Sequence, residues 1–236
     1  MIETAGRQDQ LAASLAEVRE RIARACSSAG RPAEDVTLVA VTKTYPASDV
    51  VLLAGLGVTD VGENRDQEAA AKAAEARAAG ATPRWHFIGQ LQRNKAKSVA
   101  GYADVVESVD SLRLVSALER AVADRPEPLE ALVQVSIDGD PSRGGAVGDD
   151  LWRISDAVAA SSALRLGGLM AVAPLGWEPD RAFEQLAALH RRLVAAHPAA
   201  TAISAGMSAD LEAAVRHGAT HVRIGTSLLG MRNPLR

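Results

Sequence analysis

The feature that most constrains the fold of this chain is a repeated alternation of short apolar segments with helical ones. Runs rich in β-branched residues predict strands at 36–42, 58–64, 84–89, 104–109, 129–137, 164–172, 200–206 and 220–225. Helical patterns lie between them, at 48–57, 65–79, 111–123, 179–197 and 208–217. This alternation is typical of parallel βαβ units, and strands this continuously apolar indicate a sheet covered on both faces.

Eight such units in 236 residues favour a closed (β/α)8 TIM-type barrel. The alternative is an open, doubly wound sheet, which normally carries a glycine-rich fingerprint after its first strand; the segment VAVTKTYP (39–46) has none. Residues 8–29 predict an extra helix before the barrel, with one apolar stripe. No Pro/Gly/Ser linker divides the chain, so we predict a single domain over 1–236, in which 1–35 lead into the barrel.

Composition excludes several classes of function. The chain is 47% hydrophobic and 23% charged with a net charge of −3, which gives no electrostatic footprint for nucleic acid or for an anionic membrane. The N-terminus lacks the apolar core of a signal peptide and no apolar run reaches membrane-spanning length, so we expect a cytoplasmic protein. The single cysteine, Cys26, excludes an internal disulfide and a cysteine-based metal cluster, and is expected to pack in the first helix.

Lysine is rare in this chain, and one lysine stands at the end of the first strand. Of 26 basic residues only four are lysines, namely Lys43, Lys72, Lys95 and Lys97. Lys43 shares the parity of Val39 and Val41 and so continues one face of the strand. Its amine can attack a carbonyl, whereas a guanidinium cannot. The simpler interpretation is a solvated cation at a strand–loop junction.

Other polar groups stand where the remaining strands end. A barrel gathers these ends at one mouth, where its chemistry takes place, and often binds phosphate with the loops after strands 7 and 8. Here those loops contain Gly206 with Ser208, and Gly225 with Thr226 and Ser227. Their glycines and hydroxyls suit an anion, although Ser208 could equally cap a helix and Gly225 could serve a tight turn.

A strand-end lysine beside a phosphate site predicts a phosphorylated carbonyl compound held as a Schiff base. A sugar phosphate, as in an aldolase, and pyridoxal 5′-phosphate both fit. Arg223 favours the second, because the pyridoxal ring nitrogen needs a partner and a guanidinium keeps it unprotonated, which weakens the electron sink. The alternative for Arg223 is a salt bridge to Glu63 or another acid across the mouth.

Several long motifs, in order, then show a family resemblance. LVAVTKTYPASDV, VGENRDQE, WHFIGQLQRNK, GLMAV and GMSADLEAAVRHGATHVRIGTSLLG resemble the YggS/PROSC-type pyridoxal phosphate homeostasis proteins, over about 36–231. The resemblance implies the barrel of the alanine racemase N-terminal domain, and members that bind the vitamin B6 cofactor and influence its free pool. It implies Lys43 as the Schiff-base lysine, Arg223 as the ring-nitrogen partner, Asn64 beside the cofactor, and Ser204, Gly225 and Thr226 around the phosphate. We add the strand-end residues Met170, Met207 and Ser208 to this predicted site.

The chain departs from the family pattern at several places, two of which change a polar or charged residue. Arg65 stands where a tyrosine usually follows GEN, and 142–145 read Ser-Arg-Gly-Gly where SKxG is usual. A role of that family lysine toward a second cofactor molecule is therefore not carried over to Arg143. His86 and Lys95 match the family without an assigned step, and His86, on an apolar strand, is expected to be a hydrogen-bonded core histidine.

The sequence favours a carrier of the cofactor over an enzyme. A racemase needs a base on each face of the substrate, and related racemases take a tyrosine from a second domain, which we expect this chain to lack. Its two tyrosines, Tyr45 and Tyr102, occupy no recognised catalytic position. We expect a monomer or weak dimer that delivers pyridoxal phosphate to apo-enzymes. The alternatives are a weak racemase or decarboxylase, a Schiff-base aldolase, and a structural barrel that would tolerate Lys43→Arg.

Overall fold

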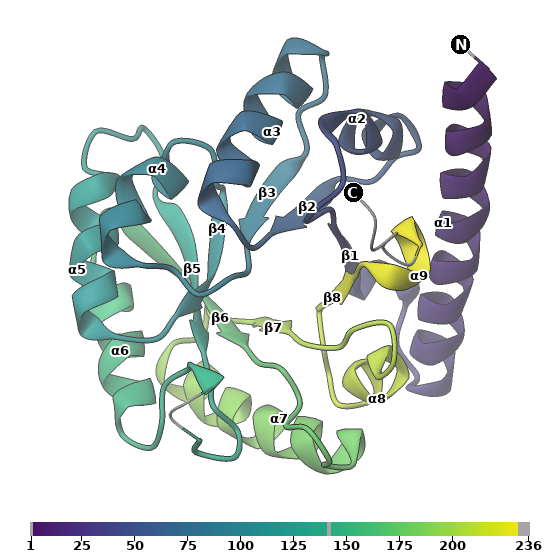
Figure 1. Cartoon of the computed structure of the whole chain (residues 1–236). Helices are drawn as coiled ribbons and strands as arrows, with labels where there is room; N and C mark the ends of the chain where they lie inside the picture. Colours follow the sequence, from purple (N-terminus) through teal and green to yellow (C-terminus); the bar gives the residue numbers. More distant parts are fainter. Residues whose placement is uncertain (1, 141–142, 231–236) are drawn as a thin grey trace.

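The computed structural model describes residues 2–140 and 143–230, and its centre is a closed barrel of parallel strands in the order β1 to β8 (Figure 1). The strands are β1 (Thr37–Val41), β2 (Asp60–Glu63), β3 (Arg84–Phe87), β4 (Val105–Val109), β5 (Leu129–Gln134), β6 (Leu164–Met170), β7 (Ala202–Ser204) and β8 (His221–Ile224). β8 pairs with β1 in parallel register and closes the barrel. The predicted (β/α)8 barrel is therefore confirmed.

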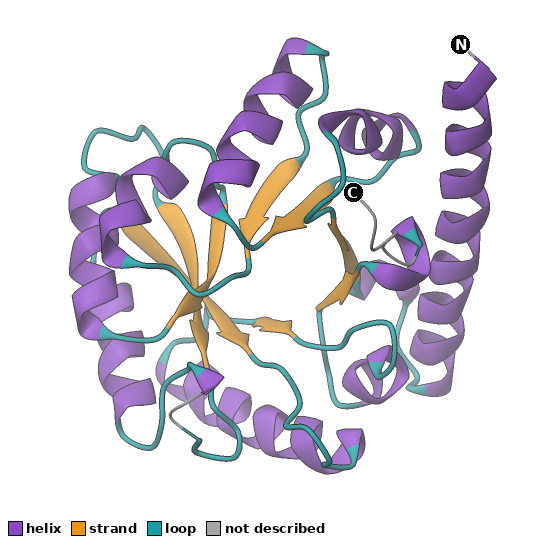
Figure 2. Cartoon of the chain, in the orientation of Figure 1, coloured by secondary structure: helices purple, strands orange, loops and turns teal. Residues whose placement is uncertain are grey.

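Helices surround the barrel on its outside (Figure 2). They are α1 (Ile2–Ser28), α2 (Ala47–Gly55), α3 (Asp66–Ala78), α4 (Ala96–Ala100), α5 (Leu112–Ala121), α6 (Asp150–Ala160), α7 (Pro179–Ala196), α8 (Leu211–Arg216) and α9 (Thr226–Leu229), with 3-10 turns η1 (Ala33–Asp35) and η2 (Arg93–Lys95). Among the described residues, none of these helices is long and apolar enough to cross a bilayer.

The extra helix α1 is anchored along its length to the barrel's outer helices. Its apolar stripe, Leu11, Leu15, Val18 and Ile22, is buried together with Cys26, as predicted. Arg7 pairs with Asp49 of α2 at 2.6 Å, and Figure 1 shows α1 running beside α8 and α9. The helix thus covers the side of the barrel where β1 and β8 meet.

The predicted elements differ from the observed ones mainly at their ends. Each predicted strand contains an observed strand, but 200–206 shortens to the three residues of β7. The helix predicted at 208–217 begins only at Leu211, because Asp210 Oδ1 instead accepts the Met207 N–H at 2.6 Å in a turn. The helix predicted at 8–29 begins at Ile2 and ends at Ser28. Helices α4 and α6 are not among those predicted, although Leu151, Ile154 and Val158 gave α6 a detectable apolar stripe.

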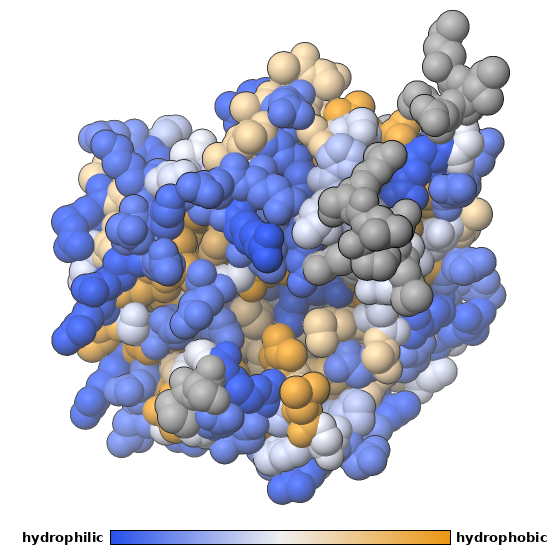
Figure 3. Space-filling model, viewed as in Figure 1, coloured by the Kyte–Doolittle hydropathy of each residue, from blue (hydrophilic) through white to orange (hydrophobic). Residues whose placement is uncertain are grey.

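The apolar core lies mostly between the strands and the helices. Two large clusters fill this outer layer, one under α1 to α3 and one under α4 to α7. Inside the barrel the apolar cluster has only four members, Val105, Leu132, Met170 and Ala202. TIM barrels are usually filled by layers of branched apolar side chains, so the interior here has room for polar groups. The outward-facing surface in the view of Figure 3 is mainly hydrophilic, with small separate hydrophobic areas.

Gly168 provides a test of the strand packing. It lies in β6 at φ +152°, and a Cβ there would come within 1.9 Å of the Ala202 carbonyl oxygen in β7. We expect Gly168→Ala to lower the free energy of unfolding by about 4 kcal/mol or more, because backbone must move. Gly55→Ala is the matched control: nothing lies within 4 Å of its Cβ position, so stability should be unchanged or rise by up to about 1 kcal/mol. Urea denaturation measures both, and equal stabilities would contradict this packing.

Candidate functional site

Lys43 follows β1 by two residues, at the carboxyl end of the barrel. The chain turns there: the Tyr45 N–H donates to the Thr42 carbonyl at 3.0 Å, and Thr44 has a positive φ of 70°. The Lys43 side chain is half-buried. Because β8 is the neighbour of β1, with Val39 opposite Arg223, the lysine and the arginine come from adjacent strands.

The two loops predicted to hold a phosphate lie together on this side of the mouth. The Ser227 N–H donates to Ser208 Oγ at 3.3 Å, which joins the loop after β7 to the start of α9 after β8. A Cβ on Gly225 would lie 3.5 Å from Val41, so this loop also rests against the end of β1. Gly206 has φ +89° and leaves no space for a side chain, since its Cβ would meet Ala214 at 2.6 Å. Thr226 is exposed at the N-terminus of α9.

Arg223 lies buried in the barrel interior and is held from two sides. Its Nη1 donates to Ser204 Oγ at 2.7 Å, and its Nη2 donates to the Ala171 carbonyl at 2.8 Å. Glu107 Oε2 is 3.8 Å from Nη1. The salt bridge considered as an alternative therefore forms with Glu107 of β4, whereas Glu63 pairs with Lys72 at 2.6 Å on the other side of the barrel wall.

The bond network continues across the interior beyond Arg223. Ser204 Oγ donates to Glu107 Oε2 at 2.6 Å, and His86 joins Glu107 Oε1 at 2.7 Å to Asp60 Oδ1 at 2.9 Å. Since β7 and β4 are not neighbours in the barrel, these bonds must pass through its interior. We call Asp60, His86, Glu107, Ser204 and Arg223 the interior polar chain. It confirms the expectation that His86 is a hydrogen-bonded core residue.

The interior polar chain contains buried groups of opposite charge. Burial alone would lower the pKa of His86, but its hydrogen bonds to Asp60 and Glu107 outweigh burial and raise this pKa to about 9. Burial alone would raise the pKa of Glu107, but the hydrogen bond and charge of His86, followed by Arg223, bring it to about 2. Burial lowers the pKa of Arg223, against the charge of Glu107. At neutral pH the interior polar chain therefore carries two cations and two carboxylates.

The other predicted residues spread around the same end. Asn64 follows β2, and a Cβ on Gly89 would fall within 2.3 Å of its carbonyl oxygen, so this close approach requires glycine. Met170 is buried at the end of β6 in the interior apolar cluster. Met207 is 40% exposed. Thus Lys43, Arg223, Gly225, Thr226 and the loop after β7 share one side, while Asn64 and Met170 flank it on β2 and β6. Ser204, expected around the phosphate, instead has its hydroxyl engaged by Arg223 and Glu107 in the barrel interior.

Sequence reasoning missed the acids that hold this arrangement. Glu107 stands in the middle of the apolar strand segment DVVESV, and a charged residue there could have indicated a buried polar network. Asp60 gave no comparable signal, because it lies in a segment of ordinary polarity.

Neither tyrosine faces the barrel interior. Tyr45 Oη donates to the Gly230 carbonyl at 2.8 Å. Tyr102 packs edge-on against Trp85 in the outer layer, with ring centroids 6.4 Å apart, and burial raises the pKa of its hydroxyl. Cys26 is a residue of α1 itself and is buried on the side of this helix that faces the barrel.

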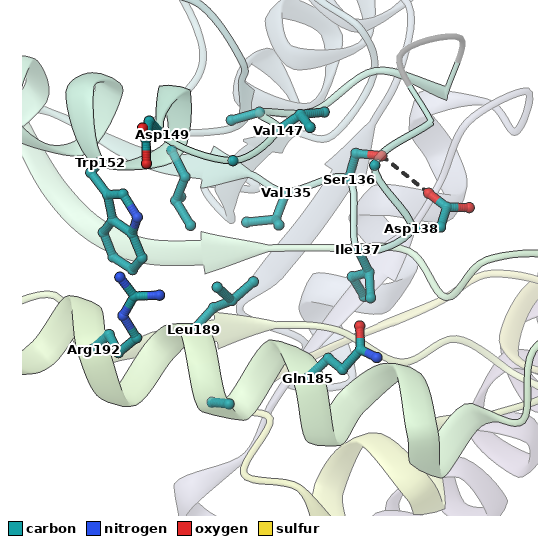
Figure 4. A pocket seen from close by; sticks show the side chains of 15 residues that line it. Val135, Ser136, Ile137, Asp138, Val147, Asp149, Trp152, Gln185, Leu189 and Arg192 are labelled. Carbon is teal, nitrogen blue, oxygen red and sulfur yellow. Dashed lines mark hydrogen bonds between the residues drawn. The ribbon is translucent and has the colours of Figure 1, made fainter.

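The loop after β5 lies beside a separate cavity. Ser142 is outside the described residues; Arg143 pairs with Asp138 at 2.8 Å and donates to the Ala173 carbonyl at 3.1 Å. The cavity, of about 610 Å³, opens between this loop, α6 and α7 (Figure 4). The guanidinium of Arg192 stacks on Trp152 at 4.4 Å from the ring centre. None of the nine residues predicted to bind the cofactor, all of which are described, lines it.

Comparison with known proteins agrees with this geometry. The alanine racemase N-terminal domain family model matches residues 13–233. A pyridoxal phosphate homeostasis protein of Mycobacterium leprae is 47% identical, over 97% of this chain and 96% of that protein. One from Escherichia coli K12 is 39% identical, over 95% and 98%. The chain belongs to the pyridoxal phosphate homeostasis protein family.

A solved structure also shares the fold of this chain. The structure of PipY from Synechococcus elongatus PCC7942 with pyridoxal phosphate bound has a TM-score of 0.82 and 32% identity, and the match covers 93% of this chain and 100% of that one. The resemblance seen in the motifs is thereby confirmed at the level of family and fold.

The interior polar chain predicts how stability depends on pH. His86 has a folded pKa of about 9 against an ordinary value of 6.5, so its stabilisation is complete below pH 6.5 and is lost as pH rises to 9. Glu107, at about 2 against 4.5, stabilises above pH 4.5 and loses this as pH falls to 2. We expect the free energy of unfolding to fall by on the order of 3 kcal/mol between pH 6.5 and 9.

His86→Gln should flatten this alkaline limb in urea titrations taken at half-unit pH steps. The limb belongs to His86, because burial lowers the pKa of His190 and His221, whose contributions therefore change only below pH 6.5. His190→Gln is the matched control and should keep the limb. A wild-type curve that is flat from pH 6.5 to 9 would contradict the assigned charge state.

Proposed function

We propose that this chain binds pyridoxal 5′-phosphate in the barrel mouth, covalently through the amine of Lys43, and serves its homeostasis and delivery. The observation that carries the proposal is that Lys43, Arg223 and the joined loops after β7 and β8 meet on adjacent strands at one barrel end. The names of the relatives and the cofactor bound to PipY support the same ligand. We also propose that residues 1–236 form one barrel domain.

The residues at the mouth fit the parts of this cofactor. Arg223 offers a fixed guanidinium for the ring nitrogen, since Ser204 and Ala171 hold it from two sides. Gly225, Thr226 and Ser208 offer hydroxyls and close backbone approach for the phosphate, with Met207 at the rim and Asn64 and Met170 beside the ring. When bound, pyridoxal phosphate supplies an electron sink for chemistry at an amino-acid α-carbon.

The residues around this site favour binding over turnover. A guanidinium does not give up its proton at physiological pH, so Arg223 leaves the ring nitrogen without a proton and the sink weak. A second base opposite Lys43 would come most simply from tyrosine or cysteine, but Tyr45, Tyr102 and Cys26 are engaged or buried elsewhere. A carrier that acts in the cytoplasm, as a monomer or weak dimer, and passes the cofactor to apo-enzymes fits these residues.

Reduction with borohydride tests the covalent attachment. After incubation with pyridoxal phosphate and reduction, we expect peptide mapping to find the phosphopyridoxyl mass on Lys43, with loss of the yellow absorption band. Lys43→Arg keeps the charge and should give no adduct, whereas the surface variant Lys97→Arg should label like the wild type. An adduct confined to other lysines would refute the site. Labelling by a sugar phosphate instead would favour an aldolase.

Exchange of the α-proton tests turnover. With L-alanine and pyridoxal phosphate in D2O, we expect the protein to incorporate deuterium no faster than the free cofactor at equal concentration, because no second base is poised. Nuclear magnetic resonance of the amino acid measures this, and chiral chromatography detects any D-alanine. Exchange about 100-fold above the free cofactor, abolished in Lys43→Arg, would establish an enzyme.

A further inference from the structure

A cluster of mostly buried side chains behind β1 holds the backbone on both sides of Lys43. It consists of Lys72, Glu63 and Glu68, which bind Thr42 and Thr44, and we call it the Lys72 cluster. We infer that Lys72 is a positioning residue, which presets the conformation in which Lys43 presents its amine to a ligand carbonyl. This inference rests on the proposed function.

Lys72 is a buried cation with three acceptors. It lies in α3 and is 4% exposed. Its Nζ donates to Glu63 Oε1 at 2.6 Å, to the Thr42 carbonyl at 2.8 Å and to Glu68 Oε1 at 3.3 Å. An ammonium group is a compact charge whose donors can converge on three points, which a planar guanidinium fork cannot do. This geometry explains a lysine at this position in a chain whose basic residues are mostly arginine.

The same acceptors reach the residues before and after Lys43. Thr42 Oγ1 donates to Glu63 Oε1 at 2.7 Å, and the Thr44 N–H donates to Glu68 Oε1 in a short hydrogen bond. Thr44 has φ +70° and is the sole non-glycine residue with positive φ in the described part of the chain. A β-branched residue adopts this conformation only where its surroundings impose it. The Lys72 cluster supplies that constraint.

The cluster is placed on a rigid frame. Glu63 ends β2 and is fully buried, and α3 packs against the outer layer through Ala69, Ala73 and Ala76. Burial raises the pKa of Glu63 despite the hydrogen bond of Lys72, and its Oε2 has no partner among the described atoms. An arrangement chosen for stability alone would be better served by apolar side chains of similar size. The specific effect of the Lys72 cluster is to fix the turn at 42–44.

Two ligands separate positioning from general stability. Pyridoxal phosphate can bond to Lys43, whereas pyridoxamine 5′-phosphate has the same ring and phosphate but an amine in place of the aldehyde, so it binds without that bond. Lys72→Met keeps the aliphatic stem and removes the ammonium. We expect it to weaken pyridoxal phosphate binding and to slow adduct formation at Lys43 by about tenfold or more, with pyridoxamine phosphate affinity within about twofold of the wild type.

A second variant and a control complete the experiment. Glu68→Gln removes the negative charge of a half-buried side chain that accepts from both the Thr44 N–H and Lys72. It should give the same selective loss of pyridoxal phosphate binding, smaller in size. This variant provides the test if Lys72→Met does not fold. Lys97→Met, on the exposed face of α4, should bind both ligands as the wild type does.

Equal weakening of both ligands, or unchanged binding of pyridoxal phosphate, would overturn the inference, because a merely structural cluster would not distinguish the aldehyde from the amine. Failure of the proposed function looks different. In that case the wild type itself forms no adduct at Lys43.

Discussion

The site depends on a line of hydrogen-bonded charges that crosses the inside of the barrel. Asp60, His86, Glu107, Ser204 and Arg223 come from five different strands, and their bonds replace the apolar layers that usually fill such a barrel. Removing one member of a buried charged pair typically costs about 3–5 kcal/mol, because the remaining charge is left uncompensated. The members are therefore interdependent, and Arg223 keeps its place only while Glu107 and Ser204 keep theirs.

This interior explains why the stability of the fold resides in its outer layer. The four-membered apolar cluster inside the barrel contributes little compared with the two clusters between strands and helices, where Leu118, Ile154 and Phe183 are almost completely buried. The helix α1 extends this outer layer over β1 and β8. Because the outer packing holds the strands in register, the interior is free to carry charges that would destabilise a smaller domain.

The periodicities that predict the strands are local, whereas the pairings that build the site are not. Lys43 and the loops at 204–208 and 223–227 could be found from the sequence, because a parallel barrel brings all strand ends to one mouth. The acid that pairs with Arg223 could not be predicted in this way. Glu63 ends one apolar strand and Glu107 interrupts another, and only the parity of each strand decides which acid faces inward. The late start of α8 also escaped prediction, because the Asp210 side chain competes with the helix for the Met207 amide.

The barrel wall separates two polar systems that act on the same mouth. The interior polar chain fixes Arg223 from inside, and the Lys72 cluster fixes the turn that bears Lys43 from outside, through Thr42 and Thr44. Because β1 and β8 are hydrogen-bonded neighbours, each system also limits the movement of the other's strand. A ligand that bonds to Lys43 and rests on Arg223 therefore meets two groups preset in one geometry, and the ordering entropy of both is lost on folding rather than on binding.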